Sequence, residues 1–281
     1  MRASDHVSSG TLAISPSPGT PLGIALRDCK RAVTLSPMWL HSGWIDMVWR
    51  YRRTRIGPFW HTLSLGIYVI VMGVIWSAAL KQDSAQYFRF VGTSLVVWTL
   101  ISSFITEGTV TLIAGESTAL SMRFPYIAFT FQHVWRALIL FAHHFVLYLL
   151  IVIGTWHAPG WVALMALPGL LVVLANGIWM SLLAGIISLR RRDFIPAISS
   201  VMQIAMFVTP VFWPKGSLGP QLAYLADLNP LYHLLTVVRA PLLGSFAPVE
   251  SWIMSFCTLV IGSMVTFYVY GRNRDLFAYW Y

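Results

Sequence analysis

Six long apolar stretches alternate with short segments that carry most of the charged residues. The stretches cover residues 60–80, 90–113, 137–156, 161–189, 194–213 and 252–270. A helix needs about 20 mostly apolar residues to cross the ~30 Å hydrocarbon core of a bilayer. The pattern therefore predicts an all-α integral membrane protein with six transmembrane helices.

Composition supports lipid as the main solvent of this chain. Hydrophobic residues make up 57% of the sequence and charged residues only 10%, whereas soluble domains carry about 25% charged residues. The net charge of +9 does not indicate a nucleic-acid partner, because the basic residues lie between apolar stretches, as topology signals do. The two cysteines, Cys29 and Cys257, do not indicate a disulfide framework.

The distribution of the 19 Lys and Arg residues predicts the orientation. With the N-terminus inside, four lie outside, which are Lys81, Arg89, Lys215 and Arg239. The other 15 (19 minus 4) lie in cytoplasmic segments, which are Arg2, Arg27, Lys30, Arg31, Arg50, Arg52, Arg53, Arg55, Arg123, Arg136, Arg190, Arg191, Arg192, Arg272 and Arg274. This positive-inside bias predicts that both termini are cytoplasmic.

The first 36 residues are polar and rich in Ser, Pro and Gly. Segments of this composition bury too little apolar surface to offset the entropy of ordering. We expect residues 1–36 to be a flexible cytoplasmic extension, and residues 37–281 to form the transmembrane domain.

A helical pattern precedes the first span, over residues 38–55. Its apolar positions are Leu40, Trp44, Met47, Val48 and Tyr51. Its opposite face carries Ser42, Asp46, Arg50 and Arg53. The spacing predicts an interfacial amphipathic helix, which Gly57-Pro58 would end. A basic cluster that only anchors the first span would account for the same residues.

Two further segments are neither spans nor simple loops. The inner loop 114–135 predicts a short helix over 115–123, with Glu116 at its start and Arg123 at its end; it is either a docking element or a polar connection. Residues 214–251 hold two short apolar pieces, 221–225 and 231–243, that cannot cross a ~30 Å core at 1.5 Å per residue. Short re-entrant helices in the outer leaflet fit them best, with an external cap as the alternative.

Motifs of catalysis and of metal or nucleotide binding are missing from the sequence. There is no G-x-x-x-x-G-K-[ST] loop, no G-x-S-x-G elbow and no H-E-x-x-H pair. The adjacent His143 and His144 would point ~100° apart on a helix, without a further ligand nearby. We therefore expect no catalytic, metal-binding or cofactor-binding residues in this chain. Among the spans only Glu107 places a formal charge, so ion-coupled transport also fits poorly.

Several short motifs, taken in order, resemble the polysaccharide-exporting branch of the type-2 ABC transporter permeases, which move O-antigen, capsule, teichoic-acid or galactan chains. The resemblance covers residues ~38–275. It is carried by Arg50-Tyr51-Arg52-Arg53-Thr54-Arg55-Ile56-Gly57-Pro58-Phe59-Trp60, Arg123-Phe124-Pro125, Arg191-Arg192-Asp193, Thr209-Pro210-Val211 with Pro214, and Asn229-Pro230-Leu231-Tyr232 with Arg239.

The resemblance implies a homodimer of this chain in the bacterial inner membrane, carrying two cytoplasmic ABC ATPase subunits that hold ATP and magnesium. Residues 38–55 would form the gate helix, and 214–251 the re-entrant gate helices at the outer mouth. The coupling helix would lie in residues 114–126, with Glu116, Arg123, Phe124 and Pro125 as the coupling residues.

The same resemblance places the first and fifth spans along the channel, where Tyr68, Trp76, Phe207 and Phe212 are candidate lining residues. Aromatic side chains offer flat area to sugar rings, although aromatics in spans also face lipid or core. Arg50, Arg52, Arg53 and Arg55 would receive the diphosphate head group of a lipid-linked polysaccharide; positive-inside anchoring explains them equally. A type-2 permease for a drug or lipid, and a membrane-embedded enzyme, are the alternative functions.

Overall fold

The computed structural model describes residues 19–281 except 58, 123, 157 and 218, and the described residues form helices without a strand. The helices are α1 (Pro21–Thr34), α2 (Ser36–Tyr51), α3 (Phe59–Leu80), α4 (Ser84–Thr106), α5 (Gly108–Ala114), α6 (Glu116–Met122), α7 (Tyr126–Gly154), η1 (Trp161–Met165), α8 (Ala166–Arg190), α9 (Phe194–Val208), α10 (Pro220–Leu228), α11 (Pro230–Leu242), α12 (Val249–Asn273), η2 (Arg274–Leu276) and α13 (Phe277–Trp280). The all-α membrane fold predicted from the sequence is confirmed.

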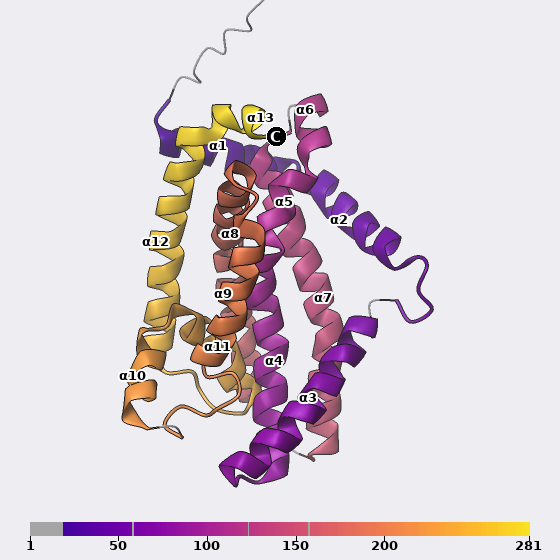
Figure 1. Ribbon diagram of the computed structural model, residues 1–281, viewed down its shortest axis with the longest axis vertical. Coiled ribbons are helices and arrows are strands. Elements are labelled where there is room, and N and C mark those ends of the chain that lie inside the picture. Colours follow the sequence, from indigo (N-terminus) through magenta and orange to yellow (C-terminus); the bar gives the residue numbers. More distant parts are fainter. Residues whose placement is uncertain (1–18, 58, 123, 157, 218) are drawn as a thin grey trace, which may run out of the picture.

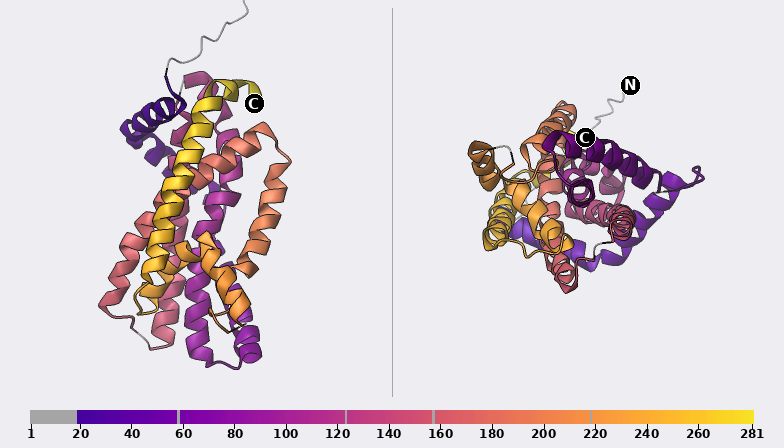
Figure 2. Two further views of the ribbon diagram at one scale, coloured as in Figure 1. Left: turned by 90° about the vertical axis from the view of Figure 1, so that its left-hand side faces the viewer. Right: turned by 90° about the horizontal axis from the view of Figure 1, so that it is seen from below.

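The long helices run side by side, and α1, α6 and α13 lie together at one end of the bundle (Figure 1). We call this the α1/α13 end. The turn between α3 and α4 lies at the opposite end, and α2 descends obliquely on the side away from α12 (Figures 1 and 2). The described part of the chain, from residue 19 to residue 281, therefore begins and ends at the same end of the bundle.

Five helices are long and apolar enough to cross a membrane: α3, α4, α7, α8 with η1, and α12. The sequence predicted a sixth over residues 194–213, and this prediction is wrong in its extent. Helix α9 has 15 residues, about 22 Å at 1.5 Å per residue. It stops at Val208 because Pro210 disfavours helical geometry at the residue before it. The second span also differs from the prediction, since α4 begins at Ser84, capped by Asp83, and is separated from α5 at Glu107.

Residues 21–34 form helix α1, so the expected flexible extension is wrong for this part, and residues 1–18 lie outside the described residues. Helix α1 packs on α12 and α7. Its buried face consists of Ile24, Ala25, Asp28 and Ala32. Small side chains and one acid supply little hydropathy, so composition alone concealed the face.

An ion pair and a close backbone approach hold α1 on α12. Asp28 Oδ2 accepts hydrogen bonds from Arg274 Nε (2.7 Å) and from the Tyr270 hydroxyl (2.8 Å). A Cβ atom on Gly271 would lie 1.8 Å from the carbonyl oxygen of Pro21. The contact therefore requires glycine on α12.

The 214–251 segment contains the two expected short helices, α10 and α11. Helix α11 is almost entirely buried and packs against α4, α8 and α12. The external-cap interpretation is therefore wrong for α11, which belongs to the bundle.

Candidate functional site: polar cavities and an aromatic cluster

Helix α2 packs against α7 through its polar side. Asp46 Oδ2 accepts hydrogen bonds from Gln132 Nε2 (2.7 Å) and from Arg136 Nη1 (3.0 Å). A Cβ atom on Gly43 would lie 2.9 Å from Trp135, so the two helices approach closely there. The predicted amphipathic helix is confirmed over residues 36–51 and ends at Tyr51.

The apolar side of α2 faces away from the bundle. Trp44, Val48 and Trp49 are about half exposed or more, at 54%, 50% and 62%. Of the polar face deduced from the sequence, Asp46 is half-buried against α7, whereas Ser42, Arg50 and Arg53 are exposed. Met47, from the predicted apolar face, is buried at 6% exposure. A helix that exposes large apolar side chains together with arginines suits a position at the interface of a lipid bilayer.

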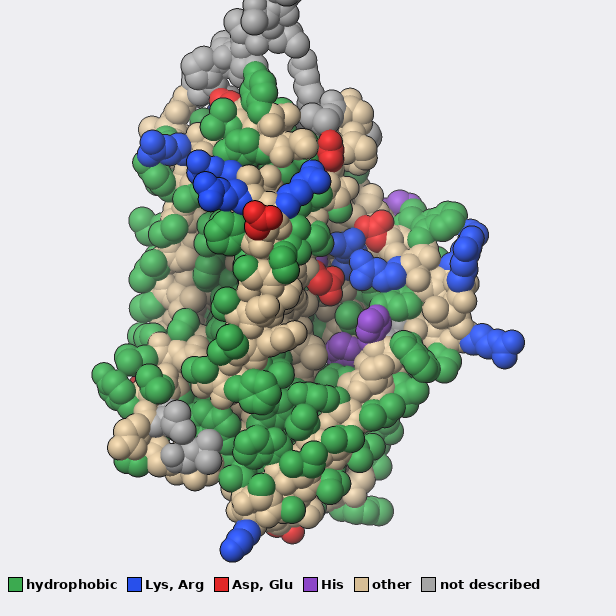
Figure 3. Space-filling view, viewed as in Figure 1, with side chains coloured by type: hydrophobic (Ala, Val, Ile, Leu, Met, Phe, Trp, Pro, Cys, Tyr) green, Lys and Arg blue, Asp and Glu red, His purple; other side chains and the backbone are tan. Residues whose placement is uncertain are grey.

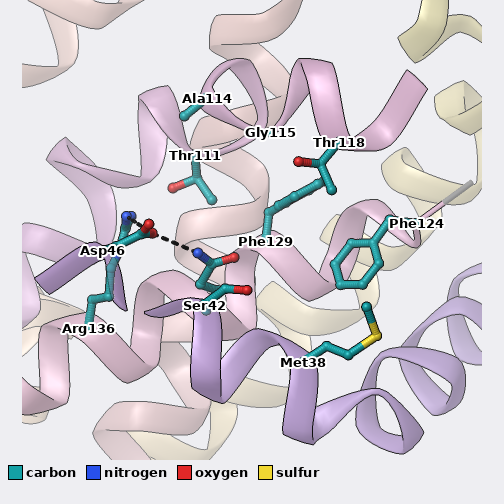
Figure 4. A pocket seen from close by; sticks show the side chains of 11 residues that line it. Met38, Ser42, Asp46, Thr111, Ala114, Gly115, Thr118, Phe124, Phe129 and Arg136 are labelled. Carbon is teal, nitrogen blue, oxygen red and sulfur yellow. Dashed lines mark hydrogen bonds and ion pairs between the residues drawn. The ribbon is translucent and has the colours of Figure 1, made fainter. Parts of the chain in front are cut away.

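A cavity of about 410 Å³ is lined by residues of α2, α5, α6 and α7 and of the turn between α6 and α7 (Figure 4). Asp46 and Arg136 lie on one side of it, and Phe124 and Met38 lie on another. Residues of the predicted gate helix α2 and of the segment after α6 therefore line the same cavity.

A second, smaller cavity of about 230 Å³ lies between α2, α4 and α7. One wall of it, formed by α4 and the residue that follows, carries hydroxyl and carboxyl side chains, which are Thr99, Ser102, Ser103, Thr106 and Glu107. The four hydroxyls donate to carbonyl oxygens within α4, so their oxygens can still accept hydrogen bonds. We call this cavity the polar inlet.

The predicted arginine cluster lies at the end of α2 and in the loop that follows. Arg50 Nη1 is 4.0 Å from Glu107 Oε2 at the polar inlet, and the Arg52 guanidinium lies 4.4 Å from the centre of the Trp49 ring. Arg53 and Arg55 are exposed. Lys and Arg side chains project from this side of the molecule at the right of Figure 3. Burial raises the pKa of the neighbouring Tyr51 hydroxyl, although Arg50 lowers it.

Helix α6 confirms the short helix predicted over residues 115–123, with Glu116 in its first turn. Phe124 packs on Phe129 with ring centres 5.3 Å apart, and Pro125 is the N-cap of α7. Arg123 lies outside the described residues. Three of the four predicted coupling residues thus frame the turn between α6 and α7.

The four aromatic side chains proposed from the sequence come together in one cluster. Phe212 is their centre, with ring centres 6.2 Å from Tyr68, 6.3 Å from Trp76 and 5.6 Å from Phe207. Phe212 is fully buried, whereas Phe207 is 56% exposed. The cluster therefore has an inner ring, Phe212, and three outer rings that pack against it, Tyr68, Trp76 and Phe207.

Residues 209–213, which follow α9, are not helical, and other segments satisfy their backbone. The Tyr87 hydroxyl donates to the carbonyl oxygen of Phe212, and Arg239 Nη1 donates to that of Pro210 (2.6 Å). Irregular backbone inside a membrane protein requires such partners. The sequence analysis assigned Arg239 to the outer side of the membrane but did not predict its burial, and the structure shows the residue at 6% exposure on α11. The position of this arginine within the apolar residues 231–243 was the sequence signal for its burial.

The adjacent histidines make separate local contacts. His143 Nδ1 lies 2.8 Å from the carbonyl oxygen of Ile139, and His144 Nδ1 lies 3.3 Å from Thr99 Oγ1. Within the described part of the chain, His, Cys, Asp and Glu side chains form no group of three that could hold a metal ion.

Comparison with known proteins decides the family. The family model described as "ABC-2 type transporter" matches residues 42–243, more than half of the chain. The chain belongs to this family. It is therefore a membrane transport permease, and family members work with an ABC ATPase partner. The permease is also similar to the O-antigen export system permease protein RfbA of Myxococcus xanthus, with 21% identity over 193 residues that cover 68% of this chain and 74% of the relative.

The region matched by the family model includes most of the site features described above. The matched region begins within α2 and ends after α11, so it includes the polar inlet, α6 and the aromatic cluster. Helix α1 lies outside it. Arg239 Nη1 also donates a hydrogen bond to Ser94 Oγ on α4 (3.1 Å). The contacts of Asp46 with Arg136 and of Arg239 with Ser94 were not found from the sequence, because the partners are 90 and 145 residues away.

Proposed function

We propose that this permease exports a lipid-linked polysaccharide, such as an O-antigen or capsule chain, across the bacterial inner membrane. ATP hydrolysis on a separate nucleotide-binding subunit drives the export. The observation that carries this proposal is the aromatic cluster, in which rings from α3 and from the end of α9 gather around Phe212. The similarity to an O-antigen export permease agrees with it.

The aromatic cluster suits a chain of sugar rings. A sliding polysaccharide must contact flat surfaces without binding tightly at any unit, and aromatic side chains provide such surfaces with a polar group on Tyr and Trp. Tyr68, Trp76 and Phe207 are partly exposed and can meet the chain. Phe212 is buried behind them and fixes their positions.

The arginines at the end of α2 receive the lipid diphosphate head group. Arg50 is paired with Glu107 only at 4.0 Å, and both side chains are nearly half exposed. A phosphate offers a guanidinium a bidentate and charge-assisted partner, so it can displace this contact. Arg52, Arg53 and Arg55 extend the basic surface along the loop to α3.

The working assembly is a homodimer with two ABC ATPase subunits on the cytoplasmic face, and both chain termini lie on that face. Helix α6 with Glu116, Arg123, Phe124 and Pro125 contacts the ATPase. ATP and magnesium bind to the ATPase and not to this chain. The cavity between α2 and α6 gives the two helices room to move relative to each other when the ATPase closes.

A strain that lacks this gene tests the substrate class. The strain should accumulate lipid-linked glycan inside the cell, and the intact gene should restore export. Increased sensitivity to a drug, or a change in lipid distribution, with normal surface glycan would contradict the proposal and indicate the drug or lipid permease.

Replacement of Arg52 and Arg53 by Ala tests the head-group role. Export should fall several-fold while the complex with the ATPase still assembles, because the charges contact substrate and not the partner. Arg272→Ala, which alters an exposed arginine at the end of α12, is the matched control. Equal export in the double variant and the control would remove the head-group role.

A further inference from the structure

A crevice of about 300 Å³ opens between the ends of α8, α9 and α12 at the α1/α13 end. The helices whose ends line it, α8, α9 and α12, lie on the side of the bundle away from α2 and α3 (Figure 1). The polar inlet and the arginines of α2 therefore do not belong to it. The transport mechanism above assigns no role to this crevice.

The floor of the crevice is apolar and open to the surroundings. Ile186 and Ile187 from α8, Val269 from α12 and Phe194 from α9 line it. Ile187 is 36% exposed and Phe194 is 41% exposed. These side chains lie at the ends of the apolar parts of their helices, which is where acyl chains of a bilayer end.

The rim of the crevice is basic and aromatic. Arg190, the last residue of α8, lies with its guanidinium 5.7 Å from the centre of the Trp280 ring. Arg191 follows on the turn to α9 and also lines the crevice. Tryptophan is enriched at this depth in membrane proteins, where one part of the ring contacts acyl chains and the N–H contacts polar groups.

Among the described residues, Arg190 and Arg191 have no acidic partner, in contrast to three arginines elsewhere in the bundle. Arg50, Arg136 and Arg274 each lie within 4.0 Å of a carboxylate. Among the described residues no carboxylate lies that close to Arg190 or Arg191, although Asp193 is near in the sequence. The carboxyl end of α8 offsets part of the Arg190 charge, and Arg191 lies beyond that helix end.

We propose that this crevice binds an anionic phospholipid of the inner leaflet. The phosphate accepts hydrogen bonds from Arg190 and Arg191, and an acyl chain covers the apolar floor. Guanidinium groups bind phosphate through two parallel N–H donors, which a topology signal alone does not require. The site is independent of the exported substrate, so it remains if the proposed function is wrong.

Native mass spectrometry of the purified permease, with phosphatidylglycerol or phosphatidylcholine added, tests the proposal. The wild type should retain phosphatidylglycerol over phosphatidylcholine by about tenfold or more, since charge-assisted contacts distinguish the two head groups. The double variant Arg190→Gln with Arg191→Gln should lose the preference. Arg192→Gln changes the adjacent arginine, which does not line the crevice, and should keep it. An equal loss in Arg192→Gln, or no preference in the wild type, would overturn the proposal.

Two further measurements separate a lipid site from a phosphate site and from misfolding. Millimolar inorganic phosphate should not release the bound phosphatidylglycerol, because phosphate lacks the acyl chain; release would overturn the lipid assignment. Val269→Trp fills the floor and leaves both arginines in place, so lipid retention should fall while the melting temperature in phosphatidylcholine stays within a few degrees. Full retention in this variant would show that the floor takes no part.

Discussion

Replacement of Phe212 by Ala should destabilise the permease strongly, whereas the same change at Phe207 should not. Both side chains belong to the aromatic cluster, with ring centres 5.6 Å apart. Phe212 is fully buried and Phe207 is 56% exposed. The pair therefore separates support of the cluster from contact with substrate.

The size of the effect follows from burial. Replacing a fully buried Phe by Ala costs about 3–5 kcal/mol in water-soluble cores. Part of that cost is exposure to water on unfolding, which is smaller in a lipid environment. We expect about 3 kcal/mol for Phe212→Ala, from lost contacts with Tyr68, Trp76 and Phe207. For Phe207→Ala we expect less than about 1 kcal/mol, the usual range for exposed sites.

Equilibrium unfolding in mixed micelles, followed by circular dichroism, measures the two free energies. Export should be measured on the same variants. Phe207→Ala should export less than the wild type although its free energy of unfolding is nearly unchanged. Equal destabilisation by both changes, or less than about 1 kcal/mol for Phe212→Ala, would refute the division into inner and outer rings.

Three further changes test the contacts that position the site. Asp46→Ala should weaken docking of α2 by about 1 kcal/mol and broaden spin-label distances between α2 and α7; an unchanged distribution would count against the contact. Gly271→Val should force α1 away, because its Cβ would lie 1.8 Å from the Pro21 carbonyl oxygen. Proteolysis should then cleave α1 faster than in the control variant Gly154→Val, because a Cβ atom on Gly154 would have no atom within 4 Å. Equal cleavage of the two variants would contradict the docking of α1. Arg239→Leu should cost about 1–3 kcal/mol by leaving a backbone carbonyl unpaired; a rise in melting temperature would show that burying the cation costs more than its hydrogen bonds contribute.

The sequence was sufficient for features that depend on local pattern. Length and hydropathy predicted α3, α4, α7, α8 and α12, because a spanning helix needs about 20 apolar residues whatever surrounds it. They failed at 194–213, where an apolar run continues past the helix. Pro210, within that run, was the signal that the helix ends early.

Features that depend on distant partners could not be predicted. Asp28 and Arg274 are 246 residues apart in the chain, and neither residue alone indicates the other. The contacts of Asp46 were not predicted for the same reason, since its polar partners Gln132 and Arg136 lie on α7. The aromatic residues were chosen through resemblance to a family, and only the three-dimensional structure shows that Phe212 supports the others.

Co-purification with its cognate ABC ATPase tests the central claim most directly. The two proteins should form a complex in lipid nanodiscs, and its ATP hydrolysis should depend on this chain and rise when lipid-linked glycan is added. A change in α6, Glu116→Ala, should lower this coupled hydrolysis while the ATPase alone is unaffected. Absence of a complex, or hydrolysis that does not respond to the glycan, would contradict a polysaccharide export permease.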